Sequence, residues 1–255
     1  MTNITAIANQ KGGVGKTTTT INLATALCSI GKKVLIIDLD PQANASTGLG
    51  INEEDRKENI YDLLVSEKHK KESIKNTLIP TLDIIPATTD LAAAELEFVG
   101  LKERESRLKN ILNQIQEYDN IMIDCPPALG LLTINGLVAS DSVIIPLQCE
   151  FFALEGLSSL MFTINSIQKS YNSKLEIEGV VLTMFDKRNS LSSLVEKDVR
   201  GHLGDMVYST VIPRNVRISE APSHGKPVLI YDVGCSGSKA YIDLAKEVIK
   251  KQNEN

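Results

Sequence analysis

Several features that would place this chain in other protein classes are missing from its 255 residues. The four cysteines are scattered without any CxxC spacing, which argues against a disulfide framework, a zinc site or a cluster site. No apolar run is long enough to span a bilayer, and the first residues lack the basic and apolar regions of a secretion signal. No linker, low-complexity block or internal repeat interrupts the chain. We therefore expect a single domain over residues 1–255 in a reducing, cytoplasmic compartment, with no membrane partner.

Excess positive charge is also missing, because the net charge is −5, and this argues against nucleic acid as a partner. The charge is unevenly spread, however. Residues 186–251 carry more Lys and Arg than Asp and Glu, so this last quarter of the chain could present a basic face.

What the chain does contain is a regular alternation of short apolar runs and helix-length amphipathic stretches. The expected strands are Ile4–Ala8, Val34–Asp38, Leu82–Pro86, Asn120–Asp124, Ser142–Leu147, Gly179–Met184, Val207–Ile212 and Val228–Tyr231. The expected helices are Thr18–Ser29, Leu91–Val99, Glu103–Tyr118, Ala153–Tyr171, Leu191–His202 and Ser238–Lys250. Several strands are apolar on both faces, as in parallel sheets covered by helices on each side. The pattern predicts an α/β, doubly wound, mostly parallel sheet, which binds ligands at the carboxyl ends of its strands.

The stretch after the first expected strand has the composition of a phosphate-binding loop. Its glycines let backbone N–H groups turn toward phosphate oxygens, and the start of the next helix adds further donors. Lys16 is placed to neutralise the β- and γ-phosphates, Thr17 supplies a hydroxyl for Mg²⁺, and Thr18 can donate to the α-phosphate. The predicted ATP-binding residues of this loop are Gly12, Gly13, Val14, Gly15, Lys16, Thr17 and Thr18. Gln10 stands where the usual motif has its first glycine.

Acidic residues end two of the expected strands. Asp38 and Asp40 follow the second strand, and Asp124 closes the run Ile121-Met122-Ile123. A carboxylate in this position of a parallel sheet points at the Mg²⁺–phosphate region, and Asp124 suits the role of a metal ligand that acts through water.

These motifs together resemble one family. The run KGGVGKTT, with Lys11 before the glycines, resembles the deviant Walker A motif of the ParA/MinD superfamily. The stretches Asp38–Ser46, Asp124–Pro127 and Ile212–Pro227 are similar to the ParA/Soj pattern, and the resemblance covers essentially the whole chain. It implies a P-loop ATPase of the deviant Walker A type that hydrolyses ATP to ADP and phosphate.

The resemblance also implies roles for individual residues. Two subunits of this family close face to face over two ATP molecules, and Lys11 would reach the partner's nucleotide. Asp40 corresponds to the catalytic aspartate that positions the attacking water, and Asp38 would help to order Mg²⁺. Pro213 and Asn215 correspond to the residues that hold the adenine.

Partners follow from the same resemblance. Arg188 and Arg217 correspond to arginines that bind double-stranded DNA without sequence preference, although Arg217 could instead form an internal salt bridge, for example to Glu220. A ParB-like protein is the expected activator of hydrolysis, and the ATP-dependent homodimer is expected to associate with the nucleoid.

Other members of the superfamily fit less well. The phosphate loop begins too early for an N-terminal DNA-reading domain, and the polar ending differs from the membrane-binding helix of MinD. Two alternatives to a chromosome- or plasmid-partitioning ATPase stay open. One is an ATP-switched regulator, for example of replication initiation or of sporulation-type transcription, and the other is a positioning paralogue.

Overall fold

The computed structural model describes residues 2–150 and 153–254, and eight strands of this part of the chain form one sheet. The sheet order is β3-β4-β2-β5-β1-β6-β7-β8, and every neighbouring pair is parallel except β3 with β4. The strands are β1 (Asn3–Ile7), β2 (Val34–Asp38), β3 (Lys75–Asn76), β4 (Leu82–Ile85), β5 (Asn120–Asp124), β6 (Ser142–Gln148), β7 (Glu176–Phe185) and β8 (Val207–Pro213). The predicted doubly wound, mostly parallel α/β sheet is therefore confirmed.

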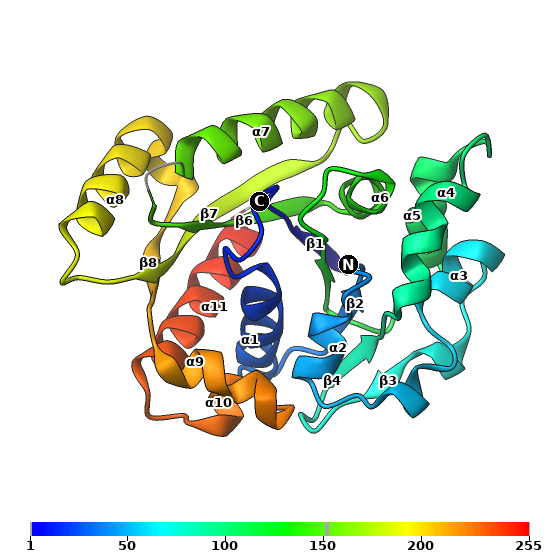
Figure 1. Ribbon diagram of the computed structural model, residues 1–255, viewed down its shortest axis with the longest axis horizontal. Helices are drawn as coiled ribbons and strands as arrows, with labels where there is room; N and C mark the ends of the chain where they lie inside the picture. Colours follow the sequence, from blue (N-terminus) through cyan, green and yellow to red (C-terminus); the bar gives the residue numbers. More distant parts are fainter. Residues whose placement is uncertain (1, 151–152, 255) are drawn as a thin grey trace.

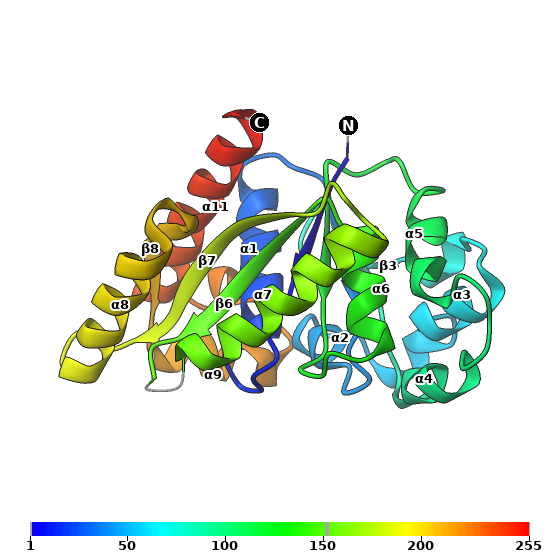
Figure 2. The ribbon, with the colours of Figure 1, turned by 90° about the horizontal axis from the view of Figure 1, so that it is seen from above.

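Helices cover both faces of this sheet (Figures 1 and 2). One face carries α1 (Lys16–Ser29), α2 (Asn44–Gly48), α10 (Val228–Tyr231) and α11 (Ser236–Glu254). The other carries α3 (Ile60–Ser66), α4 (Ala94–Glu97), α5 (Arg107–Leu112), α6 (Leu131–Ala139), α7 (Ala153–Ser170) and α8 (Ser190–Leu203). The short helix α9 (Val216–Glu220) follows β8 and leads into the 3₁₀ turn η6 (Ala221–His224). Within the described residues, no helix is both long and apolar enough to cross a bilayer.

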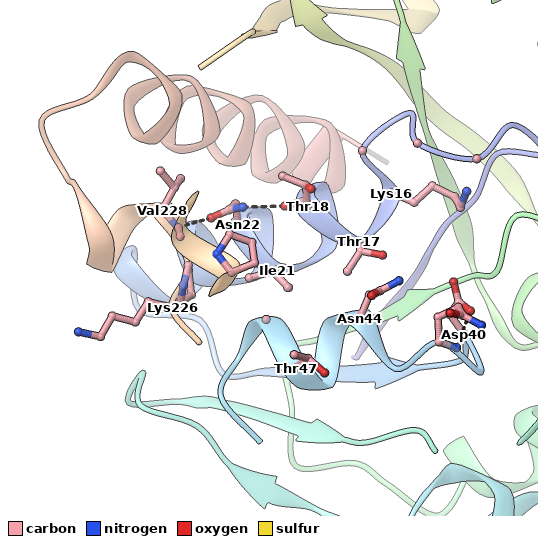
Figure 3. Close-up of a pocket in the computed structure, with 18 of the residues that line it drawn as sticks. Lys16, Thr17, Thr18, Ile21, Asn22, Asp40, Asn44, Thr47, Lys226 and Val228 are labelled. Atoms are coloured by element: carbon pink, nitrogen blue, oxygen red, sulfur yellow. Dashed lines mark hydrogen bonds between the residues drawn. The ribbon is translucent and has the colours of Figure 1, made fainter. Parts of the chain in front are cut away.

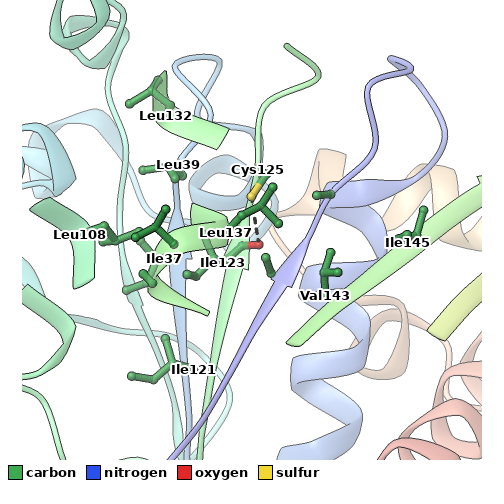
Figure 4. Packing of buried hydrophobic residues seen from close by; sticks show 14 of the residues in the cluster. Ile37, Leu39, Leu108, Ile121, Ile123, Cys125, Leu132, Leu137, Val143 and Ile145 are labelled. Atoms are coloured by element: carbon green, nitrogen blue, oxygen red, sulfur yellow. Dashed lines mark hydrogen bonds between the residues drawn. The ribbon is translucent and has the colours of Figure 1, made fainter. Parts of the chain in front are cut away.

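The central strands bury apolar side chains on both of their faces, which is why their sequences show no alternation. In β2, Leu35 and Ile37 pack into the core beneath α5, α6 and α7, whereas Val34 and Ile36 pack beneath α1 and α11. Figure 4 shows part of the first core, where Ile121 and Ile123 of β5 lie among residues from the helices and neighbouring strands. This double burial fixes the strand ends that carry the polar site.

One expected strand is wrong. Val228–Tyr231 forms the single-turn helix α10, not a strand. Pro227 occupies its N-cap position, and the backbone N–H of Val228 donates to Oδ1 of Asn22 in α1 at 2.7 Å. Val228 and Leu229 are buried beside α1 and α11. Four apolar residues in a row fit a buried strand or a buried helical turn equally well, and periodicity cannot distinguish the two.

Two expected helices are shorter than predicted. The segment from Leu91 to Val99 contains a 3₁₀ turn, Thr89–Ala93, followed by only the four residues of α4. The segment from Glu103 to Tyr118 contains another turn, Arg104–Ser106, and α5, which ends at Leu112. Ile115 and Tyr118 are nevertheless buried. The spacing of apolar residues in this segment therefore indicated which residues are buried, but not a continuous helix. The helices α3 and α6 were not expected.

Two segments that are far apart in the sequence touch backbone to backbone. Gly50, after α2, and Gly225, after η6, both have positive φ values, 76° and 62°. A Cβ added at Gly225 would lie 2.8 Å from Cα of Gly50, and one added at Gly50 would lie 3.1 Å from the carbonyl oxygen of Gly225. Only glycine combines this conformation with so close an approach.

Candidate ATP and magnesium site

A cavity of about 450 Å³ opens beside the start of α1 and the loop after β2 (Figure 3). The predicted residues that line it are Gly12, Gly13, Gly15, Lys16, Thr17, Thr18 and Asp40. The loop after β1 and the loop after β2 both lie at carboxyl ends of parallel strands, where a ligand site is expected in this fold. The structure therefore gathers most of the predicted phosphate-loop residues around one cavity.

Hydrogen bonds from distant residues shape the phosphate loop. Gly15 is the N-cap of α1 and has a φ of 89°, a left-handed conformation that favours glycine. The buried Val14 turns away from the cavity, and its carbonyl oxygen accepts from Oγ1 of Thr183 at 2.8 Å. Asn9 donates to the carbonyl of Pro146 at 2.7 Å and accepts from the N–H of Lys11 at 2.9 Å. Sequence reasoning missed both Asn9 and Thr183; Asn9 adjoins the motif, but nothing in the sequence marks Thr183.

Lys16 is almost completely buried, at 7% exposure. Its Nζ donates to the carbonyl oxygen of Lys11 at 3.1 Å, so the ammonium lies over the phosphate loop. Burial lowers the pKa of this lysine, while the nearby carboxylates of Asp124 and Asp40 act in the opposite direction. A cation in this position is set to neutralise a bound phosphate.

The strand register places Asp38 and Asp124 side by side. The two residues are Cα partners at the ends of β2 and β5, and both are fully buried. Asp38 uses its oxygens to hold the following loop, since Oδ2 accepts from the N–H and the hydroxyl of Ser46 at 2.8 and 2.7 Å, and Oδ1 accepts from the N–H of Asp40 at 3.3 Å. Ser46 was not predicted, although it lies inside the second motif.

Asp124 is engaged on one side only. Its Oδ1 accepts from the hydroxyl of Thr20 at 3.1 Å, whereas Oδ2 is buried and forms no hydrogen bond to any residue in the described part of the chain. Burial, and next to it the charge of Asp38, raise the pKa of Asp124 to about 8. A buried carboxylate oxygen without a partner indicates a missing cation or donor. Oxygen ligands from Asp124 and the nearby hydroxyl of Thr17 are what Mg²⁺ prefers, so these residues fit that ion.

Asp40 lines the same cavity as Thr17 (Figure 3). It is 7% exposed, and its Oδ1 accepts from the N–H of Gln42 at 3.0 Å. The carboxylate thus has a fixed orientation and still borders the space in which a water molecule could approach a phosphate.

Lys11 lies outside the cavity lining. Its Nζ forms an ion pair with Oε2 of Glu150 at 2.7 Å, and the two side chains are 40% and 46% exposed. The other carboxylate oxygen of Glu150 accepts from Nε2 of Gln148. The ammonium of Lys11 therefore faces outward from the loop rather than toward the space above Lys16.

A second cavity of about 290 Å³ adjoins the first through shared residues, among them Gly15 and Thr18. Pro213 and Asn215, the predicted adenine-binding residues, both line it. The Asn215 side chain caps α9, accepting from the N–H of Arg217 at 2.8 Å and donating to Oγ of Ser236 at 2.9 Å. Both polar atoms of the Asn215 side chain are therefore engaged within the chain.

The two predicted DNA-binding arginines line neither cavity. Arg188 follows β7, has an 89% exposed side chain and pairs with both carboxylate oxygens of Asp186, at 2.9 and 3.0 Å. Arg217 is half-exposed on α9 and forms ion pairs with Glu220 at 3.0 Å and Asp232 at 3.5 Å. The salt bridge to Glu220 that the sequence left open is thus present.

Comparison with known proteins places these features in context. A family model described as an AAA domain matches residues 2–177. The chain is 56% identical over 254 residues to the chromosome partitioning protein ParA of Caulobacter vibrioides, covering 98% of this chain and 95% of that protein. It is 56% identical over 249 residues to the sporulation initiation inhibitor protein Soj of Bacillus subtilis, covering 97% and 98%. The crystal structure of cobyrinic acid a,c-diamide synthase from Mycobacterium smegmatis with bound ADP and magnesium superposes with a TM-score of 0.87 at 33% identity, covering 99% and 96% of the two chains.

Proposed function

Because this chain belongs to the ParA/Soj family of chromosome-partitioning ATPases, we propose that it forms an ATP-dependent dimer that binds DNA and drives partitioning. The observation that carries the proposal is the cavity in which the phosphate loop, Lys16 and Asp40 meet. Asp124 lies near Lys16, and one of its carboxylate oxygens has no hydrogen-bond partner among the residues that the structure describes. The substrate is ATP with Mg²⁺.

Hydrolysis follows from the placement of three groups. Backbone N–H groups of the phosphate loop and the buried ammonium of Lys16 hold the β- and γ-phosphates. Thr17 and Asp124 would hold Mg²⁺, which would neutralise charge on the phosphates when it is bound. Asp40 orients the water that attacks the γ-phosphate, and its bond from the N–H of Gln42 keeps the carboxylate in place.

Dimerisation depends on Lys11. Its ammonium is half-exposed and forms a surface ion pair with Glu150, so it can exchange that partner for the phosphates of a second subunit at little cost. The lysine crosses the interface only when a γ-phosphate compensates its charge. The assembled state therefore lasts as long as ATP is intact, which makes hydrolysis the release step.

DNA binding belongs to the dimer and uses Arg188 and Arg217. Both guanidinium groups are accessible, and exposed ion pairs such as theirs exchange readily for phosphate contacts. Contacts of this kind give affinity without reading sequence. A ParB-like protein stimulates hydrolysis and so removes the dimer from the nucleoid.

Gel filtration with ATP, ADP or no nucleotide, with and without DNA, tests the proposal. A dimer that appears only with ATP, and that alone retains DNA of any sequence, is the expected result. Lys16→Ala is the matched negative variant, because backbone donors cannot replace its cation and calorimetry should detect no ATP binding. Near-normal ATP affinity in Lys16→Ala would refute the assignment of the phosphate site.

One relative gives a reason to test a second function. The Bacillus subtilis protein is named as an inhibitor of sporulation initiation, which favours an ATP-switched regulator in which turnover is incidental. The ATPase rate distinguishes the two functions. Strong stimulation by DNA together with a ParB-like peptide supports partitioning, whereas a rate unchanged by both supports the regulator.

A further inference from the structure

A buried hydroxyl links helix α1 to the strand that carries Asp124. The Thr20 side chain is fully buried, and its Oγ1 lies 3.1 Å from two oxygens, Oδ1 of Asp124 in β5 and the carbonyl oxygen of Lys16 in α1. The single proton of a hydroxyl cannot serve both acceptors fully. The Lys16 carbonyl also accepts from the N–H of Thr20 in the regular helical pattern, so the hydroxyl proton is available to the carboxylate. A hydrogen bond to an ionised oxygen is the stronger of the two.

Thr20 is separated from the nucleotide cavity by its depth. Residues three apart share a face of a helix, and Thr17 lies one turn before Thr20 on α1. Both hydroxyls lie close to Asp124. Thr17 lines the cavity, whereas Thr20 lines neither that cavity nor the adjoining one. Thr20 can therefore act on a bound ion only through Asp124.

The hydrogen bond from Thr20 fixes how the Asp124 carboxylate is turned. Rotation of a carboxylate about the bond to its Cβ is soft, so a donor on one oxygen determines where the other oxygen points. With Oδ1 held by Thr20, Oδ2 is the oxygen that has no hydrogen-bond partner among residues 2–150 and 153–254. Carboxylates that bind metal ions are characteristically held from behind by such a hydrogen bond.

We propose that Thr20 is a positioning residue for the magnesium site, whose hydroxyl turns the Asp124 carboxylate so that Oδ2 is presented to the ion. This inference rests on the proposed ATP function, and it concerns how tightly the ion is held rather than whether the nucleotide binds. The same hydrogen bond joins β5 to the helix that begins with Lys16 and Thr17. It therefore also keeps the carboxylate at a fixed spacing from the groups that hold the phosphates.

The magnesium dependence of AMPPNP binding tests this role, in the Lys11→Ala background so that dimerisation does not contribute. Calorimetry at a series of free Mg²⁺ concentrations gives the concentration of half-maximal effect, and calorimetry in EDTA gives the affinity without the ion. Loss of a residue that supports a metal ligand typically costs about 10–100-fold in metal affinity. Thr20→Val should therefore raise the half-maximal Mg²⁺ concentration by about tenfold or more and leave AMPPNP affinity in EDTA unchanged.

Thr25→Val is the matched control. Thr25 is buried on the same helix, and its Oγ1 donates to the carbonyl oxygen of Ile21 at 2.8 Å, which is the bond within the helix that Thr20 can make to Lys16. Unlike Thr20, it has no hydrogen bond to a carboxylate in the described part of the chain. Thr25→Val should keep the magnesium dependence of the parent, and so should Thr20→Ser, which retains the hydroxyl.

A Thr20→Val protein with the magnesium dependence of the parent would overturn the proposal. So would an equal loss of AMPPNP affinity with Mg²⁺ and in EDTA, because the hydroxyl would then support the fold of the phosphate loop and not the ion. If Thr20→Val does not fold, Thr20→Ser and Thr20→Ala decide the same question, since they differ only in the hydroxyl group. A parent whose AMPPNP affinity is independent of Mg²⁺ would instead contradict the proposed ATP and magnesium site.

Discussion

Replacing Lys11 with alanine separates the contribution of this lysine to the monomer from its contribution to the dimer. In the monomer, Lys11→Ala removes one ion pair to Glu150 whose side chains are 40% and 46% exposed. Such a surface pair contributes about 0–1 kcal/mol, so the free energy of unfolding should change by no more than that. ATP binding to the monomer should also persist, because Lys16 serves the bound nucleotide within the same chain.

The dimer should respond much more strongly. Its two-fold symmetry makes the lysine contact occur twice, and each charged hydrogen bond is worth about 1.5–3 kcal/mol. Losing both would weaken dimerisation by roughly 3–6 kcal/mol, or about two to four orders of magnitude in the dissociation constant. Sedimentation velocity with Mg–AMPPNP measures this directly. Glu150→Gln is the control, because it removes the partner of Lys11 in the monomer and should leave the dimer intact.

Mixing two variants sharpens the test. A dimer of one Lys11→Ala subunit and one Lys16→Ala subunit can hold a single ATP, on the Lys11→Ala chain, with an intact Lys11 reaching it from the other chain. Partial recovery of dimer or activity on mixing is expected. The reasoning is refuted if Lys11→Ala alone dimerises normally with AMPPNP.

Three further predictions concern the remaining groups of the site. Asp40→Ala should keep AMPPNP affinity within about twofold but lower the rate of single-turnover phosphate release by about 100-fold or more, as loss of a water-orienting base does. Normal phosphate release would exclude a role of Asp40 in orienting the attacking water. Arg217→Gln should weaken binding of the ATP dimer to all DNA sequences alike. It should also reduce the slope of log K against log salt by about 0.9 per lost phosphate contact. Loss of the dimer itself would instead favour a structural role for the ion pairs of Arg217. Without Mg²⁺ and nucleotide, the raised pKa of Asp124 adds stability that is fully present below its unfolded pKa and is lost as the pH rises toward about 8. The free energy of unfolding measured by urea denaturation should therefore fall across this pH range, and the fall should be smaller in Asp124→Asn.

Much of the fold could be predicted because the sheet is buried on both faces. In β2 and β5 the apolar runs end at Asp38 and Asp124 in both the sequence and the structure, since a strand between two cores has no tolerance for polar residues until it leaves them. The failure at Val228–Tyr231 has the opposite origin. That turn is short, and its helical form depends on Asn22, which is more than two hundred residues away and caps it through a contact that no local pattern encodes.

The site residues likewise fall into those that a local sequence pattern predicts and those that depend on distant parts of the chain. The phosphate loop is local, so Lys16, Thr17 and their glycines are recognisable from spacing alone. The groups that shape and complete the loop come from elsewhere: Thr183 arrives from β7, and Glu150 follows β6. Ser46 lies within the second motif, yet its hydrogen bond to Asp38 is apparent only in the folded structure.

The contact between Gly50 and Gly225 has a consequence for motion. The first glycine ends the segment that carries Asp40, and the second ends the segment that begins with the lining of the second cavity. Because the two backbones are in contact with no side chain between them, we expect the two segments to move together rather than independently. We therefore expect the walls of the two cavities to open together when a nucleotide is exchanged. Exchange of the nucleotide would then have one opening rate, and amide hydrogens on both walls would exchange with solvent together.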